Sequence, residues 1–125
     1  MKRTQELTGG FGADYAFDAI GGDVTARLVV DAIAPGGHAV LVGIPAFNVT
    51  ASISPFQMVY AEKKLTGTYY GSIRPALDFA MLADLDMDKR IDLDSLISRT
   101  YKFDEINEGF RLMTTGGVAR GVIAF

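Results

Sequence analysis

The stretch GADYAFDAIGGDVTARLVVDAIAPGGHAVLVGI, residues 12–44, decides the fold. Ala13–Ile20 has the length of a strand, and its apolar residues fall on both parities, which is typical of a parallel strand covered on both faces. Asp23 is expected to cap a helix that ends at Pro35-Gly36-Gly37. His38–Ile44 is a second apolar run. Strand, helix and strand within about thirty residues have the length of a right-handed crossover unit, so we expect an α/β fold.

A second helix and a third strand follow this crossover unit. Ser54 stands where a helix cap is expected, with proline at the first helical position of a short helix, Pro55–Glu62. Leu65–Tyr70 is rich in threonine and tyrosine, which favour strands, and a glycine closes it. The first seventy residues therefore read as part of one sheet with crossover helices.

The remaining residues predict two helices and one strand. The first helix covers Arg74–Lys89. Asp104 is expected to cap the second, which places one apolar face at helical spacing and stops at Gly116-Gly117. That face consists of Ile106, Phe110 and Met113. Val118–Phe125 is expected to be a terminal strand.

Composition excludes several classes of protein. The 125 residues allow one domain or part of a larger one, and 12 basic against 15 acidic residues leave a net charge of −3. No basic stripe indicates nucleic acid, and no apolar run approaches the ~20 residues that span a bilayer. The chain has no cysteine and begins with the polar stretch MKRTQELTGG, so we expect a cytoplasmic protein.

The glycines at the end of the first strand raise the question of a phosphate site. A dinucleotide fingerprint needs G-x-G-x-x-G directly after the first strand. Gly21-Gly22-Asp23 is too short for that pattern, and Gly10-Phe11-Gly12 precedes its strand. An aspartate at the helix start would also repel phosphate. Two interpretations stay open: the glycines let a flat ring or ribose lie against the backbone, or they only make a tight turn.

The sequence contains no complete catalytic or metal-binding motif. His38 is the single histidine, and without cysteines it cannot assemble a zinc site, so we predict neither a metal ligand nor a catalytic residue in this chain. Asp18, near a strand end, could accept a ribose hydroxyl or be a hydrogen-bonded structural group. Arg120, near the start of the last predicted strand, could hold a phosphate or be an exposed arginine.

Taken together, four segments resemble the C-terminal third of a zinc-type alcohol dehydrogenase of the medium-chain dehydrogenase/reductase superfamily. They are ELTGGFGADYAFDAIG, APGGHAVLVGIP, SPFQMVYAEKKLTGTYYGS and KFDEINEGFRLMTTGGVARGVIAF. The resemblance implies the second half of a doubly wound parallel (Rossmann-type) sheet plus a C-terminal helix-strand return segment. Residues 1–71 would be the C-terminal half of the NAD-binding domain, and residues 72–125 would pack with a catalytic domain absent here.

The resemblance also implies a cofactor and its contacts. The cofactor is NAD, with NADP not excluded, and the parent enzyme would use zinc to polarise the oxygen of an alcohol or aldehyde. Since the zinc ligands and the glycine fingerprint would lie upstream, the isolated chain is expected to be inactive. Residues that match cofactor-contacting positions lie at strand ends, beside the nicotinamide, on the next strand and at the pyrophosphate: Ala19 and Ile20, Val42 and Ile44, Thr68 and Tyr70, and Arg120.

The resemblance also implies self-association. By the same resemblance the strand that holds Thr66, Thr68 and Tyr70 pairs with its twofold mate, which implies a homodimer or higher homo-oligomer through sheet edges. One alternative is a half-domain like an S-adenosylmethionine methyltransferase, which should finish with an antiparallel hairpin rather than a capped helix and one strand. The other is a non-catalytic dimerisation module.

Overall fold

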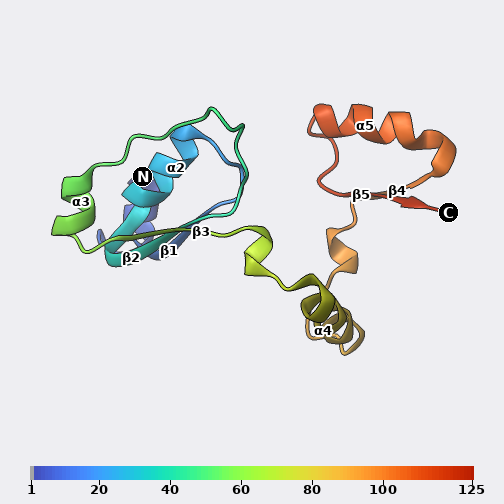
Figure 1. The fold of residues 1–125 in the computed structure, drawn as a ribbon, viewed down its shortest axis with the longest axis horizontal. Helices are drawn as coiled ribbons and strands as arrows, with labels where there is room; N and C mark the ends of the chain where they lie inside the picture. Colours follow the sequence, from blue (N-terminus) through green and yellow to red (C-terminus); the bar gives the residue numbers. More distant parts are fainter. Residues whose placement is uncertain (1) are drawn as a thin grey trace. The chain divides into compact units, whose positions relative to one another are not determined.

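A computed structural model describes residues 2–125 and divides them into two compact units, residues 2–73 and Arg74–Phe125. Figure 1 shows the order of their helices and strands along the chain. Within residues 2–125, each helix is too short or too polar to cross a membrane.

The first unit is a three-stranded parallel sheet with helices between the strands (Figure 1). The strand order is β1-β2-β3, so the chain crosses from each strand to its neighbour. This confirms the predicted α/β class and the parallel sheet. The elements are α1 (Lys2–Leu7), β1 (Ala13–Asp18), α2 (Asp23–Ala32), β2 (Ile33–Leu41), α3 (Pro55–Tyr60), β3 (Lys64–Gly67) and the 3₁₀ turn η1 (Tyr70–Ser72).

One face of this sheet carries the core. Val30, Ile33 and Ala39 are buried together, and partly buried apolar side chains from β1, α2, β3, α3 and the segment before α3 pack against them. The other face is open within this unit, because Tyr15 and Phe17 are each 63% exposed. The expectation of a strand covered on both faces is therefore wrong for this unit. The strands succeed one another in one direction, so right-handed crossovers place both helices on the same face.

Helix starts follow the sequence in one case and not in another. Ser54 caps α3 as predicted, because its Oγ accepts a hydrogen bond from the Gln57 N–H at 3.3 Å. The prediction that Asp23 caps α2 is wrong, since the cap is Gly22 and Asp23 is already helical. In the first turn the negative Asp23 carboxylate still interacts favourably with the positive end of the helix dipole.

The strands are shorter or shifted relative to their predicted ranges. β2 begins at Ile33 rather than His38, and its pairing with β1 is irregular between these two residues. β3 ends at Gly67, so the predicted strand Leu65–Tyr70 is wrong in its last three residues. The reason is local: Tyr70 has a φ of 50° and Gly71 a φ of 71°, which turn the chain into η1.

The second unit has the helices α4 and α5 and a parallel pair of short strands. A crossover through α5 joins the two strands. The sequence predicted only the last of them, over Val118–Phe125, so that prediction missed β4 and made β5 too long. The elements are α4 (Pro75–Met87), the 3₁₀ turn η2 (Asp94–Leu96), β4 (Arg99–Lys102), the 3₁₀ turn η3 (Phe103–Glu105), α5 (Ile106–Thr114) and β5 (Gly121–Ala124).

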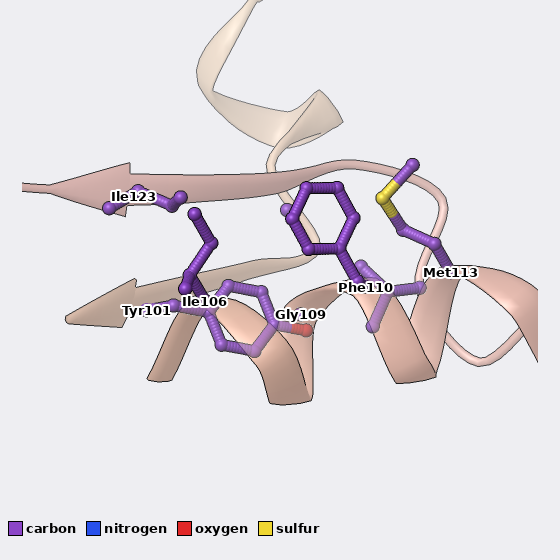
Figure 2. A pocket seen from close by; sticks show the side chains of 8 residues that line it. Tyr101, Ile106, Gly109, Phe110, Met113 and Ile123 are labelled. Atoms are coloured by element: carbon purple, nitrogen blue, oxygen red, sulfur yellow. The ribbon is translucent and has the colours of Figure 1, made fainter. Parts of the chain in front are cut away.

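An apolar groove lies between α5 and the two strands (Figure 2). Ile106, Phe110 and Met113 line it together, which confirms their predicted common face. The buried Tyr101 ring lies in it, and the Tyr101 hydroxyl has no hydrogen-bond partner among the described residues. Gly116, at a φ of 70°, ends α5 as predicted.

The predicted cap of α5 is wrong. Asp104 lies inside η3, and the residue at the cap is Glu105. The Glu105 carboxylate accepts a hydrogen bond from the Lys102 N–H at 2.9 Å and so fixes the turn between β4 and α5. Glu105 occupies the cap position of α5, but its side chain bonds no N–H group of that helix.

Candidate functional site

The carboxyl ends of β1 and β2 form a turn built around one buried carboxylate. The Asp18 side chain is 3% exposed. Its Oδ1 accepts hydrogen bonds from the N–H groups of Ile20 and Gly21, both at 3.0 Å, and its Oδ2 accepts one from the Thr25 hydroxyl at 2.9 Å. Of the two open interpretations of Asp18, these bonds support the structural one, because both of its oxygens already serve the turn.

The surroundings of Asp18 favour its ionised form. Burial alone would raise the pKa of this carboxyl, but the hydrogen bonds from Gly21, Ile20 and Thr25 outweigh burial and lower its pKa below the ordinary value. The carboxylate therefore stays charged at neutral pH and holds the start of α2 through Thr25.

Two glycines bring the ends of the strands together. The Asp18 carbonyl accepts hydrogen bonds from the N–H groups of Val42 and Gly43, each at 2.8 Å. A Cβ on Gly21 would lie 2.8 Å from the Gly43 carbonyl carbon, and a Cβ on Gly43 would collide with the backbone of residues 19–21. Gly21 is thus needed for the close approach of the neighbouring segment. Of the two open interpretations, this supports a tight turn rather than a ligand that lies against Gly21. Beside the turn lies a cavity of about 150 Å³.

Four of the predicted cofactor-contacting residues lie at the carboxyl ends of β1 and β2, which we call the β1–β2 edge. Ala19 and Ile20 follow β1, and Val42 and Ile44 follow β2. Ile20 is 78% exposed, Ile44 65% and Val42 37%. The edge therefore presents apolar side chains to solvent, on a backbone that the Asp18 bonds hold in place.

Thr68 and Tyr70 lie just past β3 rather than in it. The Thr68 N–H donates to the Leu41 carbonyl at 2.9 Å, so it continues the link between β2 and β3. The Thr68 hydroxyl lies 3.1 Å from the Ser72 hydroxyl. Tyr70 is 71% exposed, and its ring packs edge-on against that of Tyr69. Because the Thr68 N–H is already bonded to Leu41, the carbonyl is the main-chain group of Thr68 that remains for a ligand.

Arg120 belongs to the second unit and precedes β5. Its side chain is exposed, and no ion pair involving it occurs among residues 2–125. Its backbone is bonded to Ser98.

His38 lies away from this edge, at the start of the regular pairing of β2. Its Nε2 is 2.5 Å from the Thr66 hydroxyl, and its ring lies 6.0 Å from that of Tyr15. Across residues 2–125, no three histidine, cysteine, aspartate or glutamate side chains are grouped so as to hold a metal ion.

Sequence reasoning missed Thr25, Gly43 and Ser98 as parts of these sites. Gly43 carried a usable signal, because a glycine inside an apolar strand pattern indicates a close backbone approach. Thr25 and Ser98 carried none, since each bonds a residue whose position only the fold reveals.

Comparison with known proteins supports the same family. The model of the family described as zinc-binding dehydrogenase matches residues 1–85. The chain is 33% identical over 115 residues to S-(hydroxymethyl)glutathione dehydrogenase of Paracoccus denitrificans, covering 91% of this chain and 30% of that protein. It is 34% identical over 125 residues to NDMA-dependent alcohol dehydrogenase of Amycolatopsis methanolica, covering 97% of this chain and 33% of that protein.

A solved structure is similar over nearly the whole chain. Benzyl alcohol dehydrogenase from Acinetobacter calcoaceticus matches with a TM-score of 0.89 and 25% identity, over 98% of this chain and 33% of that one. The chain thus spans about a third of the length of these relatives and corresponds to their C-terminal part. The resemblance read from the four sequence segments is confirmed, and the chain belongs to the zinc-binding dehydrogenase family.

Proposed function

We propose that the complete protein is an NAD-dependent alcohol dehydrogenase of the zinc type, and that this chain supplies part of its NAD(H) site. In this proposal residues 1–71 are the C-terminal half of the NAD-binding domain, and residues 72–125 return to pack with the catalytic domain. The observation that carries it is the edge formed by Ile20, Val42 and Ile44 at the carboxyl ends of parallel strands. Open α/β sheets bind their ligands at such ends.

The chemistry of this edge suits a nicotinamide ring. A flat, weakly polar ring gains from contact with exposed aliphatic side chains, and the Asp18 hydrogen bonds fix the backbone that carries them. Ala19 lies in the same turn, and the Thr68 carbonyl and Tyr70 follow the next strand. Arg120 would add a charge-assisted contact to the pyrophosphate. The cofactor would exchange hydride with an alcohol or aldehyde carbon.

Zinc is not held by the residues described here. Residues 2–125 contain no suitable ligand group, so in this proposal zinc is bound by another part of the complete protein. We therefore expect the chain alone to lack alcohol dehydrogenase activity. NADP in place of NAD remains compatible with these residues, because the part of the site that would read the adenosine ribose lies outside them. The lack of cysteine agrees with a cytoplasmic protein.

We also propose that the protein self-associates through β3. β3 is the last strand of its sheet, with order β1-β2-β3, so one side of it has unpaired N–H and C=O groups within the unit. Such an edge is a template for pairing with a second copy. A homodimer or higher homo-oligomer is expected.

Neither alternative is favoured by a specific observation. A methyltransferase-like half-domain should end in an antiparallel hairpin, whereas β4 and β5 are parallel and joined through α5. The match to a dehydrogenase family and the exposed apolar side chains of the β1–β2 edge do not favour a non-catalytic dimerisation module.

A ligand titration of the complete protein tests this proposal. NADH and S-adenosylmethionine are titrated separately and followed by calorimetry, with zinc-replete protein. Saturable binding of NADH and none of S-adenosylmethionine is expected. The reverse pattern would support the methyltransferase alternative, and binding of neither would support the dimerisation module.

A further inference from the structure

The backbone of Arg120 is held from both sides by one serine. The Arg120 N–H donates to the Ser98 hydroxyl at 3.2 Å, and the Ser98 N–H donates to the Arg120 carbonyl at 2.9 Å. Ser98 and Arg120 directly precede the paired residues Arg99 and Gly121, where the β4–β5 ladder begins. The bond from the Arg120 N–H to the Ser98 hydroxyl thus extends the β4–β5 ladder by one residue, to Arg120.

Tyr101 holds the next residue. A Cβ on Gly121 would lie 2.7 Å from Cε2 of the Tyr101 ring, so the backbone that follows Arg120 rests against a buried side chain. Figure 2 shows this ring between α5 and the strands. Arg120 is therefore fixed before and after its own position: by Ser98 at its N–H and carbonyl, and by Tyr101 beneath Gly121.

The other two arginines near this ladder are already engaged. The Arg99 guanidinium lies 4.9 Å from the centre of the Tyr101 ring. Arg111 donates two hydrogen bonds of 2.7 Å to Glu108, which lower the pKa of that carboxyl. Within residues 2–125 the Arg120 guanidinium makes no ion pair and no hydrogen bond, and the bond to Ser98 uses the backbone N–H alone. A fixed backbone thus carries an uncommitted guanidinium.

We propose that Ser98 is a positioning residue for Arg120: its hydroxyl fixes the backbone from which the guanidinium reaches a diphosphate. This rests on the proposed function, in which Arg120 contacts the pyrophosphate of NAD(H). The gain is in preorganisation, because a guanidinium on a fixed backbone loses less conformational freedom when it binds. Ser98 touches no ligand in this account and acts only through Arg120.

The test is a double-mutant cycle on NADH affinity in the complete protein. Ser98→Ala is expected to raise the Kd for NADH about threefold to tenfold, as loss of one hydrogen bond implies. Ser98→Thr keeps a hydroxyl and should restore the wild-type Kd. Arg120→Ala should raise the Kd more than about tenfold, and adding Ser98→Ala to it should change nothing further. In turnover, Ser98→Ala should raise KM for NAD⁺ and leave kcat unchanged.

A matched control and a direct structural readout accompany the cycle. Ser95→Ala removes another exposed serine hydroxyl of the same unit, whose weak bond goes to the Asp92 carbonyl at 3.4 Å. It should leave the Kd unchanged. Amide hydrogen exchange at Arg120 reports the bond itself and should quicken in Ser98→Ala but not in Ser98→Thr. This measurement needs no activity, and unchanged exchange at the amides of α5 in the same experiment would show that the variant is folded.

The failures are distinguishable. An unchanged Kd in Arg120→Ala would overturn the proposed role of Arg120. If Arg120→Ala weakens binding but Ser98→Ala does not, the positioning role is wrong and the role of Arg120 stands. If Ser98→Ala weakens binding equally with and without Arg120, Ser98 acts by another route and the proposal is overturned.

Discussion

The two units differ in how many strands and how much core support their proposed cofactor contacts. Of the buried apolar residues in residues 2–125, Ala26, Val30, Ile33 and Ala39 belong to the first unit and only Tyr101 to the second. The first has three parallel strands with helices on one face, the second a single pair under α5. Two strands alone are marginal in water. The stability of the first unit therefore depends on several buried apolar side chains, and that of the second depends on the Tyr101 ring.

The same contrast holds at the level of single contacts. In the first unit the edge backbone is fixed by a buried carboxylate with three hydrogen bonds, on Asp18. In the second, the one side-chain hydrogen bond to the Arg120 backbone comes from an exposed hydroxyl, that of Ser98. Buried hydrogen bonds to a charged group contribute more than exposed neutral ones. Substitutions at the β1–β2 edge should therefore cost more stability than substitutions at the β4–β5 ladder.

The largest effect is expected at the contact between Gly21 and Gly43. Gly43→Val should destabilise the first unit by about 3 kcal/mol, because the added atoms meet backbone that cannot move aside. Denaturant unfolding measures it. Gly67→Val is the matched control, since a Cβ there meets nothing within 4 Å. Equal losses in the two variants would show that the close approach is not a constraint.

Asp18→Asn comes next. It should cost about 1–3 kcal/mol, because an amide nitrogen and a neutral oxygen replace the acceptors of three hydrogen bonds. Asp14→Asn, at an exposed position of the same strand, should cost little. Thermal unfolding at neutral pH separates them, and similar melting temperatures for both variants would argue against the anchoring role of Asp18.

The same carboxylate predicts a pH dependence. The folded state holds the pKa of Asp18 below the unfolded value, so its stabilisation is complete above about pH 4 and is lost as the pH falls through the folded pKa. The stability difference between wild type and Asp18→Asn should shrink over that range. A difference that stays constant below pH 4 would show that the charge of Asp18 is not responsible.

In the second unit, two glycines face the same ring with opposite expectations. Gly121→Ala should destabilise the unit by about 1–2 kcal/mol, because its Cβ would lie 2.7 Å from the Tyr101 ring. Gly109→Ala should stabilise it by up to about 1 kcal/mol, since alanine favours the helix and its Cβ would lie 3.7 Å from that ring. Unfolding of the two variants followed by tyrosine fluorescence tests this, and effects of the same sign would contradict it.

The smallest effect concerns the β3 edge. The Thr68 N–H faces β2, so the N–H of the preceding Gly67 faces the open side, since successive N–H groups alternate along a strand. Gly67→Pro should weaken self-association by about 1 kcal/mol, the contribution of one hydrogen bond. Sedimentation velocity over a concentration series measures the shift, and circular dichroism checks the fold. A concentration dependence identical to wild type would place the interface elsewhere.

The first unit was predictable from sequence because its signals are local. Apolar runs and the Ser54 cap each act within a few residues, and they predict the strand–helix–strand order. The predicted helix end at Pro35-Gly36-Gly37 is wrong, because α2 ends at Ala32 and these three residues lie inside β2. β4 was missed because RTYK, Arg99–Lys102, carries two charges in four residues and has no apolar alternation. Its pairing with β5 depends on residues more than twenty positions away.

The candidate site was predictable only in part. The edge residues came from resemblance, and the structure places four of them at adjacent strand ends. The end of β3 was wrong because a positive φ at Tyr70, a non-glycine residue, has no sequence signature. The bond between Thr25 and Asp18 spans a turn whose geometry two glycines create, so neither residue type alone indicates it.

The most direct test of the central claim is NADH affinity of the complete protein with a charge placed at the β1–β2 edge. Ile44→Asp should raise the Kd for NADH at least about tenfold, because a carboxylate would have to lose water against the dihydronicotinamide ring. Val59→Asp, at a 79% exposed position of α3, is the control and should leave the Kd unchanged. Wild-type affinity in Ile44→Asp, or an equal loss in both variants, would contradict the assignment of this edge to the cofactor.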